Sequence, residues 1–254
     1  MTTQSTPSGA ALPMIGGTLQ IKRPSKATKD LKIKMGIHGR SGVGKTRFAL
    51  GLAKHKKVFL IFSEKSETSI VRYPEFDLIE KNLEYVEVNS WLDVKLAFDY
   101  VTVNQQKYDW IIIDSTTDVN KRVIEDITEN SKEEVLSMRQ WGQVTARMER
   151  FVRYIRDLKT SVLFICLSTA DKNDMTGNVC QYPSLTGRLK EEMPAYLDIN
   201  GYAYTVEDKN EPGKVQRAIQ FVNTPGAIAK DRFDILQYEP MDMTVILKKL
   251  GMIE

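Results

Sequence analysis

Gly39-Arg-Ser-Gly-Val-Gly-Lys-Thr46 is the stretch of the chain that decides the fold. Its glycine spacing and final Lys-Thr pair fit the pattern of a phosphate-binding loop (P-loop), in which glycines let the backbone curl where a Cβ would block a phosphate. Such a loop needs a strand before it and a helix after it. Residues 31–38 alternate like a strand, and residues 46–54 carry apolar side chains at helical spacing. The sequence therefore predicts a nucleoside triphosphate site within an α/β domain.

The loop supplies most of the candidate binding residues. Its successive backbone N–H groups would face the phosphates, Lys45 would reach the β- and γ-phosphates, and the Thr46 hydroxyl would ligate Mg²⁺. The sequence contains no Asn-Lys-x-Asp guanine motif, which favours ATP over GTP. We therefore expect ATP and Mg²⁺ as cofactors. The expected binding residues are Gly39, Arg40, Ser41, Gly42, Val43, Gly44, Lys45 and Thr46.

A P-loop site also needs an acid at the end of a buried strand beside the loop strand. Trp110-Ile-Ile-Ile-Asp114 fits, because three isoleucines precede a carboxylate at the carboxyl end. Asp114 would hold Mg²⁺, with Thr46, and accept a hydrogen bond from the threonine hydroxyl. Many P-loop ATPases place a glutamate directly after this aspartate, but here the neighbour is Ser115. Glu64, after the apolar run 58–62, is the other candidate base; its alternative interpretation is a helix N-cap or a solvated acid.

The rest of the pattern predicts an α/β fold, with a mostly parallel sheet covered by helices and an antiparallel C-terminal hairpin. Residues 1–30 are rich in Thr, Ser, Pro, Gly and Lys, which predicts a flexible arm before one domain at 31–254. The alternative is an arm that docks on a neighbouring subunit. Strands are expected at 58–62, 85–88, 110–114 and 161–167, helices at 91–104, after 114 through 159 and at 243–250, and the hairpin at 200–206 and 215–223.

The composition is that of an ordinary globular chain of 254 residues, with 42% hydrophobic and 27% charged residues. A net charge of +3 is too small to indicate a nucleic-acid or membrane partner by itself, although it leaves local basic patches open. No run approaches the ~18 apolar residues of a membrane span. No basic segment followed by an apolar run marks a secretory signal, and we expect a cytoplasmic protein without a membrane partner. Cys166 and Cys180 could form one disulfide at most.

A set of short motifs resembles the phage-encoded AAA-type nucleotide-binding proteins, which include the RecA-core branch of the Sak single-strand annealing proteins. The resemblance covers about residues 31–240. It implies a RecA-like P-loop ATPase core that binds ATP and single-stranded DNA during recombination or annealing, in a phage-infected or prophage-carrying bacterial host. It also implies self-association into a ring or filament, and suggests a single-strand-binding protein as a further partner. The motifs are Gly-Val-Gly-Lys-Thr46, Phe62-Ser-Glu64, Tyr108-Asp, Ile-Ile-Asp-Ser115, Trp141-Gly, Pro183-Ser-Leu-Thr-Gly187 and Ala229-Lys-Asp-Arg232.

The resemblance places Glu64 on the family's catalytic glutamate. Lys230 and Arg232 fall where RecA-like filaments carry basic residues that reach the adjacent subunit's ATP site, and Arg217 is a further candidate. Hydrolysis would then need assembly, because the charge that stabilises the transition state comes from a neighbour. A solvated turn after residue 226 is the alternative for Lys230 and Arg232.

Leu167-Ser-Thr169 departs from the family pattern, which usually has a Gln or His here to sense the γ-phosphate. Either hydroxyl could bond a phosphate instead, and hydrolysis is expected to be slow or loosely coupled to DNA. The two DNA loops of RecA-like proteins would fall near residues 130–140 and 169–190. The second loop carries the candidate DNA-binding residues, which are Lys172, Tyr182, Arg188 and Lys190. The alternative is a long polar surface loop.

Two other functions stay open. One is a P-loop kinase of a small molecule, although no arginine-rich lid is evident in the sequence. The other is a nucleotide-gated protein-binding ATPase without DNA activity. Near the site, Tyr73 is either an adenine-stacking residue or a packing residue beside Pro74, and His38 is interpreted as a strand-end residue rather than a catalyst.

Overall fold

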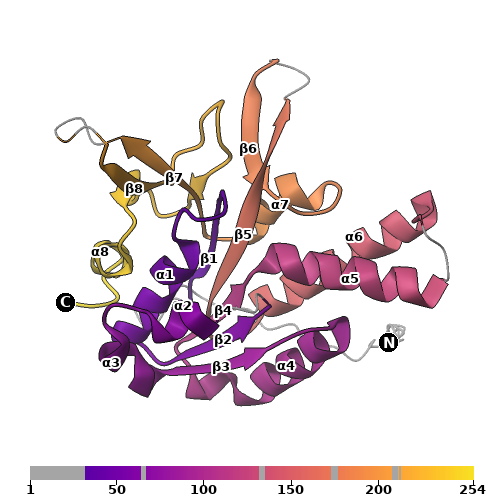
Figure 1. Cartoon of the computed structure of the whole chain (residues 1–254), viewed down its shortest axis with the longest axis horizontal. Coiled ribbons are helices and arrows are strands. Elements are labelled where there is room, and N and C mark those ends of the chain that lie inside the picture. The colour runs from indigo at the N-terminus through magenta and orange to yellow at the C-terminus, as the bar shows by residue number, and fades with distance from the viewer. Residues whose placement is uncertain (1–31, 64–66, 132–134, 173–176, 208–210, 212) are drawn as a thin grey trace, which may run out of the picture. The chain divides into compact units, whose positions relative to one another are not determined.

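The computed structural model describes residues 32–63, 67–131, 135–172, 177–207, 211 and 213–254, and the predicted arm at 1–30 lies outside them. The described chain forms a ten-stranded sheet with helices on both faces (Figure 1). Most of the strands are parallel, and an antiparallel hairpin lies near the C-terminus. The predicted α/β fold class is confirmed.

The bounds of the elements are as follows. The strands are β1 (Lys34–Gly39), β2 (Val58–Phe62), β3 (Leu83–Glu87), β4 (Trp110–Asp114), β5 (Ser161–Lys172), β6 (Val179–Pro183), β7 (Ile199–Glu207), β8 (Val215–Gln220), β9 (Lys230–Asp231) and β10 (Tyr238–Pro240). The helices are α1 (Lys45–Leu50), α2 (Glu67–Val71), α3 (Phe76–Ile79), α4 (Trp91–Asn104), α5 (Thr116–Ser131), α6 (Met138–Arg156), α7 (Leu189–Tyr196) and α8 (Met243–Lys249).

The strands lie in the order β10-β8-β7-β1-β5-β4-β2-β3, so the loop strand β1 is central. This order corrects one prediction. The strand of Asp114, β4, does not lie beside β1, because β5 pairs with both of them. The sequence shows where strands are but not which of them pair, since parallel neighbours are joined by long crossovers.

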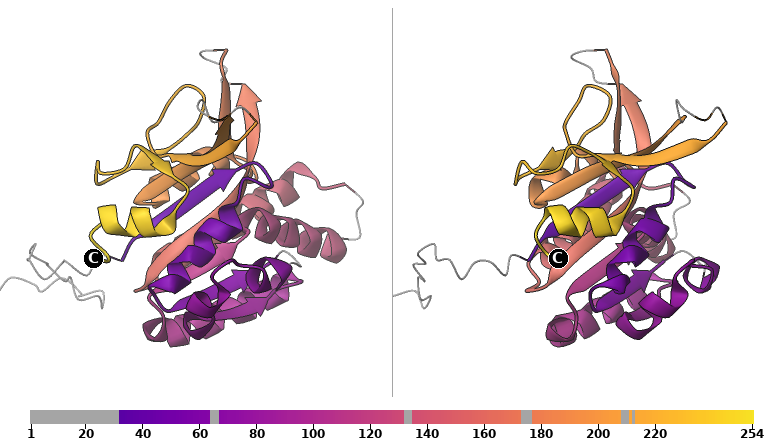
Figure 2. Two further views of the ribbon diagram at one scale, coloured as in Figure 1. Left: turned by 60° about the vertical axis from the view of Figure 1, so that its left-hand side comes forward. Right: turned by 90° about the vertical axis from the view of Figure 1, so that its left-hand side faces the viewer.

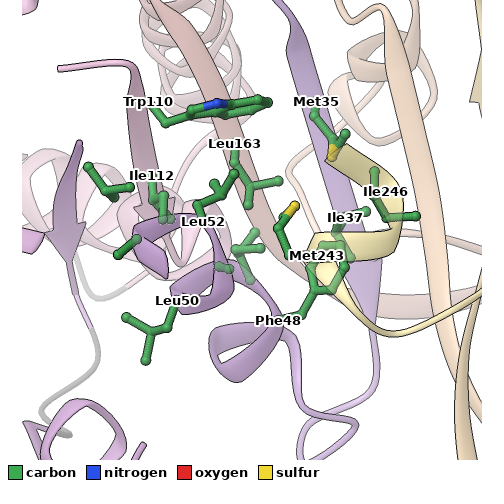
Figure 3. Packing of buried hydrophobic residues seen from close by; sticks show 14 of the residues in the cluster. Met35, Ile37, Phe48, Leu50, Leu52, Trp110, Ile112, Leu163, Met243 and Ile246 are labelled. Atoms are coloured by element: carbon green, nitrogen blue, oxygen red, sulfur yellow. The ribbon is translucent and has the colours of Figure 1, made fainter. Parts of the chain in front are cut away.

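Alternation along the strands divides the core between the two faces of the sheet. In β4, Trp110 and Ile112 face α1 and α8, whereas Ile111 and Ile113 face the layer of α4, α5 and α6. Figure 3 shows the first face, where Met243 of α8 packs near Phe48 of α1. Every side chain of β4 is buried, as expected of a strand covered on both sides.

Of the helices that cover the second face, α4 begins where the sequence predicts it to. Ser90 caps α4 in a capping box with Asp93. The long helical region predicted after Asp114 is two helices, α5 and α6, and the apolar side chains that recur at helical spacing in α6 are buried from Val144 onward. Trp141 is the exception, because 40% of it is exposed in the first turn of α6.

Residues 169–190 differ from the polar loop that the sequence predicts. β5 continues to Lys172 and pairs antiparallel with β6, so that the described residues form a hairpin that stands above the sheet (Figures 1 and 2). α7 follows from Leu189. The end of β5, residues 170–172, is exposed on both faces and therefore carries no hydrophobic alternation, which is why the sequence pattern predicts no strand there.

Candidate functional site

The P-loop connects the carboxyl end of β1 to α1. Gly42 and Gly44 have φ angles of 77° and 102°, in the left-handed region that a residue with a Cβ rarely adopts. Gly39 is required for a different reason, since a Cβ there would lie 2.4 Å from the backbone oxygen of Ala203 in β7. The three glycines thus serve two purposes: turning the loop and letting β7 approach it.

Two polar side chains at the end of the loop make hydrogen bonds at the site, one to the loop itself and one to β4. The Lys45 ammonium donates to the carbonyl oxygens of Gly39 and Arg40, each at 2.9 Å, and only 7% of the residue is exposed. The Thr46 hydroxyl donates to Asp114 Oδ2 at 2.6 Å. The structure therefore brings together Lys45, Thr46 and Asp114, which the sequence predicts as the centre of the site.

The Thr46–Asp114 pair suits a hard divalent cation. Both groups offer oxygen, which is the ligand atom that Mg²⁺ prefers, and the carboxylate of Asp114 is 1% exposed at the end of β4. Bound Mg²⁺ would neutralise phosphate charge next to the loop. These two residues are the ones that fit this role.

Two cavities meet at the loop. One of about 330 Å³ is lined by loop residues, Asp114 and Tyr73. A second, of about 420 Å³, shares Gly44, Arg47 and Tyr73 with the first and extends toward β8 and the start of α8. Phosphates cradled by the loop would occupy the first cavity, which leaves the second for the rest of a nucleotide.

Tyr73 forms the wall common to the two cavities and is only 8% exposed. The Lys54 ammonium lies 5.5 Å from the centre of its ring and forms an ion pair with Glu75. Burial raises the pKa of the Tyr73 hydroxyl, so the side chain stays neutral. Of the two interpretations that the sequence leaves open, the structure supports a packed residue whose ring also borders the nucleotide cavity.

Arg217 lies against the loop of its own chain. Its Cδ and Nε atoms are 3.4 and 3.5 Å from the position that a Cβ on Gly44 would occupy. The sequence offers Arg217 as a residue for a neighbouring subunit's site. The structure places it instead beside the P-loop of the same subunit, on β8. No local pattern signals this, because the two residues meet only through the order of the strands.

The end of β2 is tied to the end of β4. Ser63 accepts a hydrogen bond from the Ser115 N–H at 2.9 Å, donates to the Ser115 carbonyl at 3.2 Å, and its own N–H donates to the Asp114 carbonyl. Glu64 is the next residue, but it lies outside the described residues. The described chain thus brings the residue before Glu64 to the carboxyl rim of the sheet, next to Asp114.

His38 is fully buried in β1, directly before the loop. Nε2 lies 2.8 Å from the Ile228 carbonyl, which can only accept, so Nε2 carries the proton and Nδ1 accepts from the Ser168 hydroxyl at 2.8 Å. Burial lowers the pKa of His38 to about 4, which keeps it neutral. Because the Ser168 hydrogen is used by His38, Ser168 has no proton left to donate to a phosphate. Of the two hydroxyl groups considered above, Thr169 is the one that keeps this ability.

The two other basic candidates lie toward the amino ends of the strands, away from the loop. Lys230 is opposite Asn200, and its ammonium donates to the carbonyls of Pro194 and Leu197 at 3.0 and 2.8 Å. Arg232 forms an ion pair with Asp198 at 2.7 Å, and 55% of its side chain is exposed. Neither of the two approaches the P-loop of its own chain among the described contacts.

The DNA-binding candidates gather on the hairpin and the start of α7. The Lys190 ammonium lies 5.6 Å from the centre of the Tyr182 ring and forms an ion pair with Asp171. Lys172, at the end of β5, and Arg188, just before α7, are both exposed. The structure therefore brings an aromatic ring and basic groups together, but one of these charges is neutralised by Asp171.

A further cavity lies between the hairpin and the second helix layer. It measures about 700 Å³ and is lined by residues of α5, the start of α6 and the turn 184–187. Trp141 and Met138 line it, and Met138 is 89% exposed. Trp141 precedes Val144, the first buried residue of α6, and this position at the start of the helix explains its exposure.

A mostly parallel sheet with a P-loop at the end of its central strand, and a buried aspartate bonded to the threonine of that loop, defines a nucleotide-binding P-loop ATPase. Residues 31–233 match the AAA domain family, and the chain belongs to that family. No curated protein sequence matches the chain. Within the described residues, no helix combines the length and apolar character that crossing a membrane requires.

Proposed function

We propose that the protein is a RecA-like, Mg²⁺-dependent ATPase that acts on single-stranded DNA in phage recombination or strand annealing, as an assembly of subunits. The observation that carries the proposal is the meeting of Lys45, Thr46 and Asp114 at the carboxyl rim of the sheet, from which the β5–β6 hairpin rises. This rim combines a phosphate site with exposed basic and aromatic residues. We expect it to act in the cytoplasm of an infected or prophage-carrying bacterium.

Hydrolysis requires water to attack the γ-phosphorus, which breaks the bond to the β,γ-bridging oxygen and releases ADP and phosphate. We assign proton transfer from this water to Glu64, since its neighbour Ser63 is bonded to Asp114 and Ser115. Lys45 and Arg217 offset the negative charge on the phosphates. Mg²⁺, held by Thr46 and Asp114, adds charge neutralisation when bound.

The nucleobase fits the cavity of about 420 Å³ beside the loop. Its lining includes the Tyr73 ring and apolar side chains of Met241 and Val215, against which a base can pack. Arg47 lines both cavities, and Arg217 lines this one and lies against Gly44 of the loop, so both can approach the ribose and the phosphates. The nucleotide would therefore run from the P-loop toward β8.

Single-stranded DNA fits the surface between the hairpin and α6. Trp141 and Tyr182 provide rings on which bases can stack, and Lys172 and Arg188 provide charge for phosphates. Arg232, which is exposed, is the candidate for a neighbouring subunit's site, since the ammonium of Lys230 is held by two carbonyls.

The deciding experiment measures ATP turnover with and without a single-stranded oligonucleotide, at several protein concentrations. We expect turnover to need Mg²⁺, to rise with the oligonucleotide and to increase more than linearly with protein concentration. A turnover per subunit that ignores both the oligonucleotide and the protein concentration would contradict the DNA and assembly parts of the proposal. It would then favour a nucleotide-gated protein-binding ATPase, for which the neutralisation of Lys190 by Asp171 is the supporting observation.

A further inference from the structure

A groove between α4 and α6 has no part in the proposed ATPase site. Its cavity of about 350 Å³ shares no lining residue with the cavities at the P-loop. The two helices belong to the layer on the face of the sheet opposite α1 (Figure 1). Any function of this groove is therefore separate from phosphate binding.

Aromatic rings form the floor of the groove. Trp91 meets Phe151 edge-to-face at 6.1 Å between ring centres, and Phe98 meets Tyr154 in the same way at 4.4 Å. Phe151 is buried, but 56% of Tyr154 is exposed. Edge-to-face pairs hold the rings in defined positions, so the floor is ready to receive an apolar side chain before anything binds.

Positive charges surround this floor. Lys95 of α4 and Arg150 of α6 line the groove and are exposed, and no ion pair of either is found among the described residues. Arg147 is a third cation of the lining, and it forms an ion pair with Asp126. Among the described lining residues, Asp99 is the only carboxylate. The groove therefore combines an apolar floor with an excess of positive charge.

Exposed leucines continue the apolar surface along α4. Leu92 and Leu96 are each 58% exposed. They lie on the same side of α4 as the groove residues Lys95 and Asp99, because residues three or four apart are neighbours on a helix surface. Large apolar side chains in contact with water beside a preformed groove are typical of a surface that another protein covers.

We propose that the groove binds an acidic peptide segment of a partner protein, which carries a large apolar side chain next to its acidic residues. The apolar side chain would sit against Phe98 and Tyr154, and the acidic run would lie along Lys95 and Arg150. A nucleic-acid strand fits less well, because it requires a continuous track of cations for successive phosphates, and Asp99 interrupts this one.

The test uses the full chain and a fluorescein-labelled peptide with five aspartates followed by Leu-Phe. Two comparison peptides carry either Ser-Ser in place of Leu-Phe or five lysines in place of the aspartates. Fluorescence anisotropy is expected to show saturable binding of the first peptide, weakened by added salt, and binding of the comparison peptides at least about tenfold weaker.

Substitutions then locate the binding site. Arg150→Glu and Tyr154→Ala are each expected to raise the Kd of the first peptide about tenfold. Arg139→Glu, which reverses an exposed charge on the same helix outside the groove, is the matched control and is expected to leave the Kd unchanged. Thermal melting checks that Tyr154→Ala remains folded.

Three results would overturn the proposal. The first is equal binding of all three peptides, or no binding of any. The second is equal weakening by Arg150→Glu and Arg139→Glu, which would show a diffuse charge effect. The third concerns self-association, measured by light scattering. If Arg150→Glu loses a self-associated form that Arg139→Glu keeps, and the Kd of the peptide does not change, the groove belongs to a contact with a second copy of this chain.

Discussion

Ser63 is the last described residue before the proposed base Glu64. It donates to the Ser115 carbonyl and accepts from the Ser115 N–H, and its own N–H donates to the Asp114 carbonyl. We expect Glu64→Gln to bind ATP as the wild type does and to lose turnover by at least about a hundredfold, because the amide cannot accept a proton. Calorimetric titration with ATP and a phosphate-release assay measure the two quantities. Glu67→Gln is the matched control, since Glu67 bonds the Tyr85 hydroxyl at an exposed position. Normal turnover in Glu64→Gln would remove this residue from the mechanism.

His38 predicts a pH dependence of stability. Its pKa is lowered by burial to about 4 in the folded protein, against an ordinary value of 6.5. Below pH 6.5 the His38 imidazole binds a proton in the unfolded chain but stays neutral in the folded chain. The free energy of unfolding therefore falls as the pH drops toward 4. A shift of this size corresponds to about 3 kcal/mol in total.

Urea unfolding at pH 7 and pH 5 checks this prediction. The wild type is expected to lose more stability between the two pH values than His38→Gln, which cannot titrate. His55→Gln is the control, because it makes the same replacement at an exposed histidine. Equal losses in the wild type and His38→Gln would show that other groups govern the pH response.

Several site residues could be predicted from the sequence, and others could not. Lys45 and Thr46 follow from the loop pattern, and Asp114 follows from a carboxylate at the end of an apolar run. Arg217 and Tyr73 take their places through packing of distant segments, for which neighbouring residues carry no signal. Site residues that belong to a local sequence motif can thus be predicted, whereas residues that reach the site through contacts between distant segments cannot.

Among the elements, α4 offers the simplest test. Its N-terminal Ser90 accepts from the Asp93 N–H, and the Asp93 carboxylate accepts from the Ser90 N–H in return. We expect Ser90→Ala to lower the free energy of unfolding by about 1 kcal/mol, since a helix-end N–H loses its partner. Urea unfolding measures the change. Lys95→Ala, at an exposed position of the same helix, should cost less than about 0.5 kcal/mol. An equal cost for both would mean that the cap adds nothing specific.

Elements with a hydrophobic period were predictable, and those without one were not. The continuous apolar run of β4 and the capped start of α4 agree with the structure at the residue level. The outer half of β5 and β6 did not show in the sequence, because their side chains do not alternate between apolar and polar. Such a hairpin is stabilised by backbone hydrogen bonds, which do not depend on how hydrophobic the side chains are.

At the scale of the whole molecule, mixing two inactive variants distinguishes residues that act within their own subunit from residues that act on a neighbouring subunit. Lys45→Ala subunits should bind no nucleotide but keep intact surfaces. In an equal mixture with Arg232→Ala subunits, turnover is expected to reach about a quarter of the wild-type value. Half of the sites bind ATP, and half of those lie next to a subunit that still has Arg232. Mixed with Arg217→Ala subunits, the Lys45→Ala subunits should restore none, because Arg217 lies at its own P-loop.

The phosphate-release assay measures these mixtures, and each variant alone is the control. Restored turnover in the mixture of Lys45→Ala and Arg217→Ala subunits would contradict the action of Arg217 within its own subunit. Failure to restore Arg232→Ala, with the variant alone inactive, would remove Arg232 as the residue that reaches a neighbour.

The strand order was the part of the whole molecule that the sequence left undetermined. Five strands before the hairpin could be placed along the chain, but their pairing is decided by burial of both faces and by crossovers that leave no local trace. This is why β4 was expected beside β1 and instead lies beyond β5.

The central position of β1 also determines how late in synthesis the strand can complete its pairing. β1 pairs with β5 and β7, both of which come far later in the chain. On a ribosome that adds about 5–20 residues per second, the P-loop strand waits roughly ten seconds or more for its second partner. A nascent chain that stops before β7 should therefore not retain ATP, even though it already contains the whole loop.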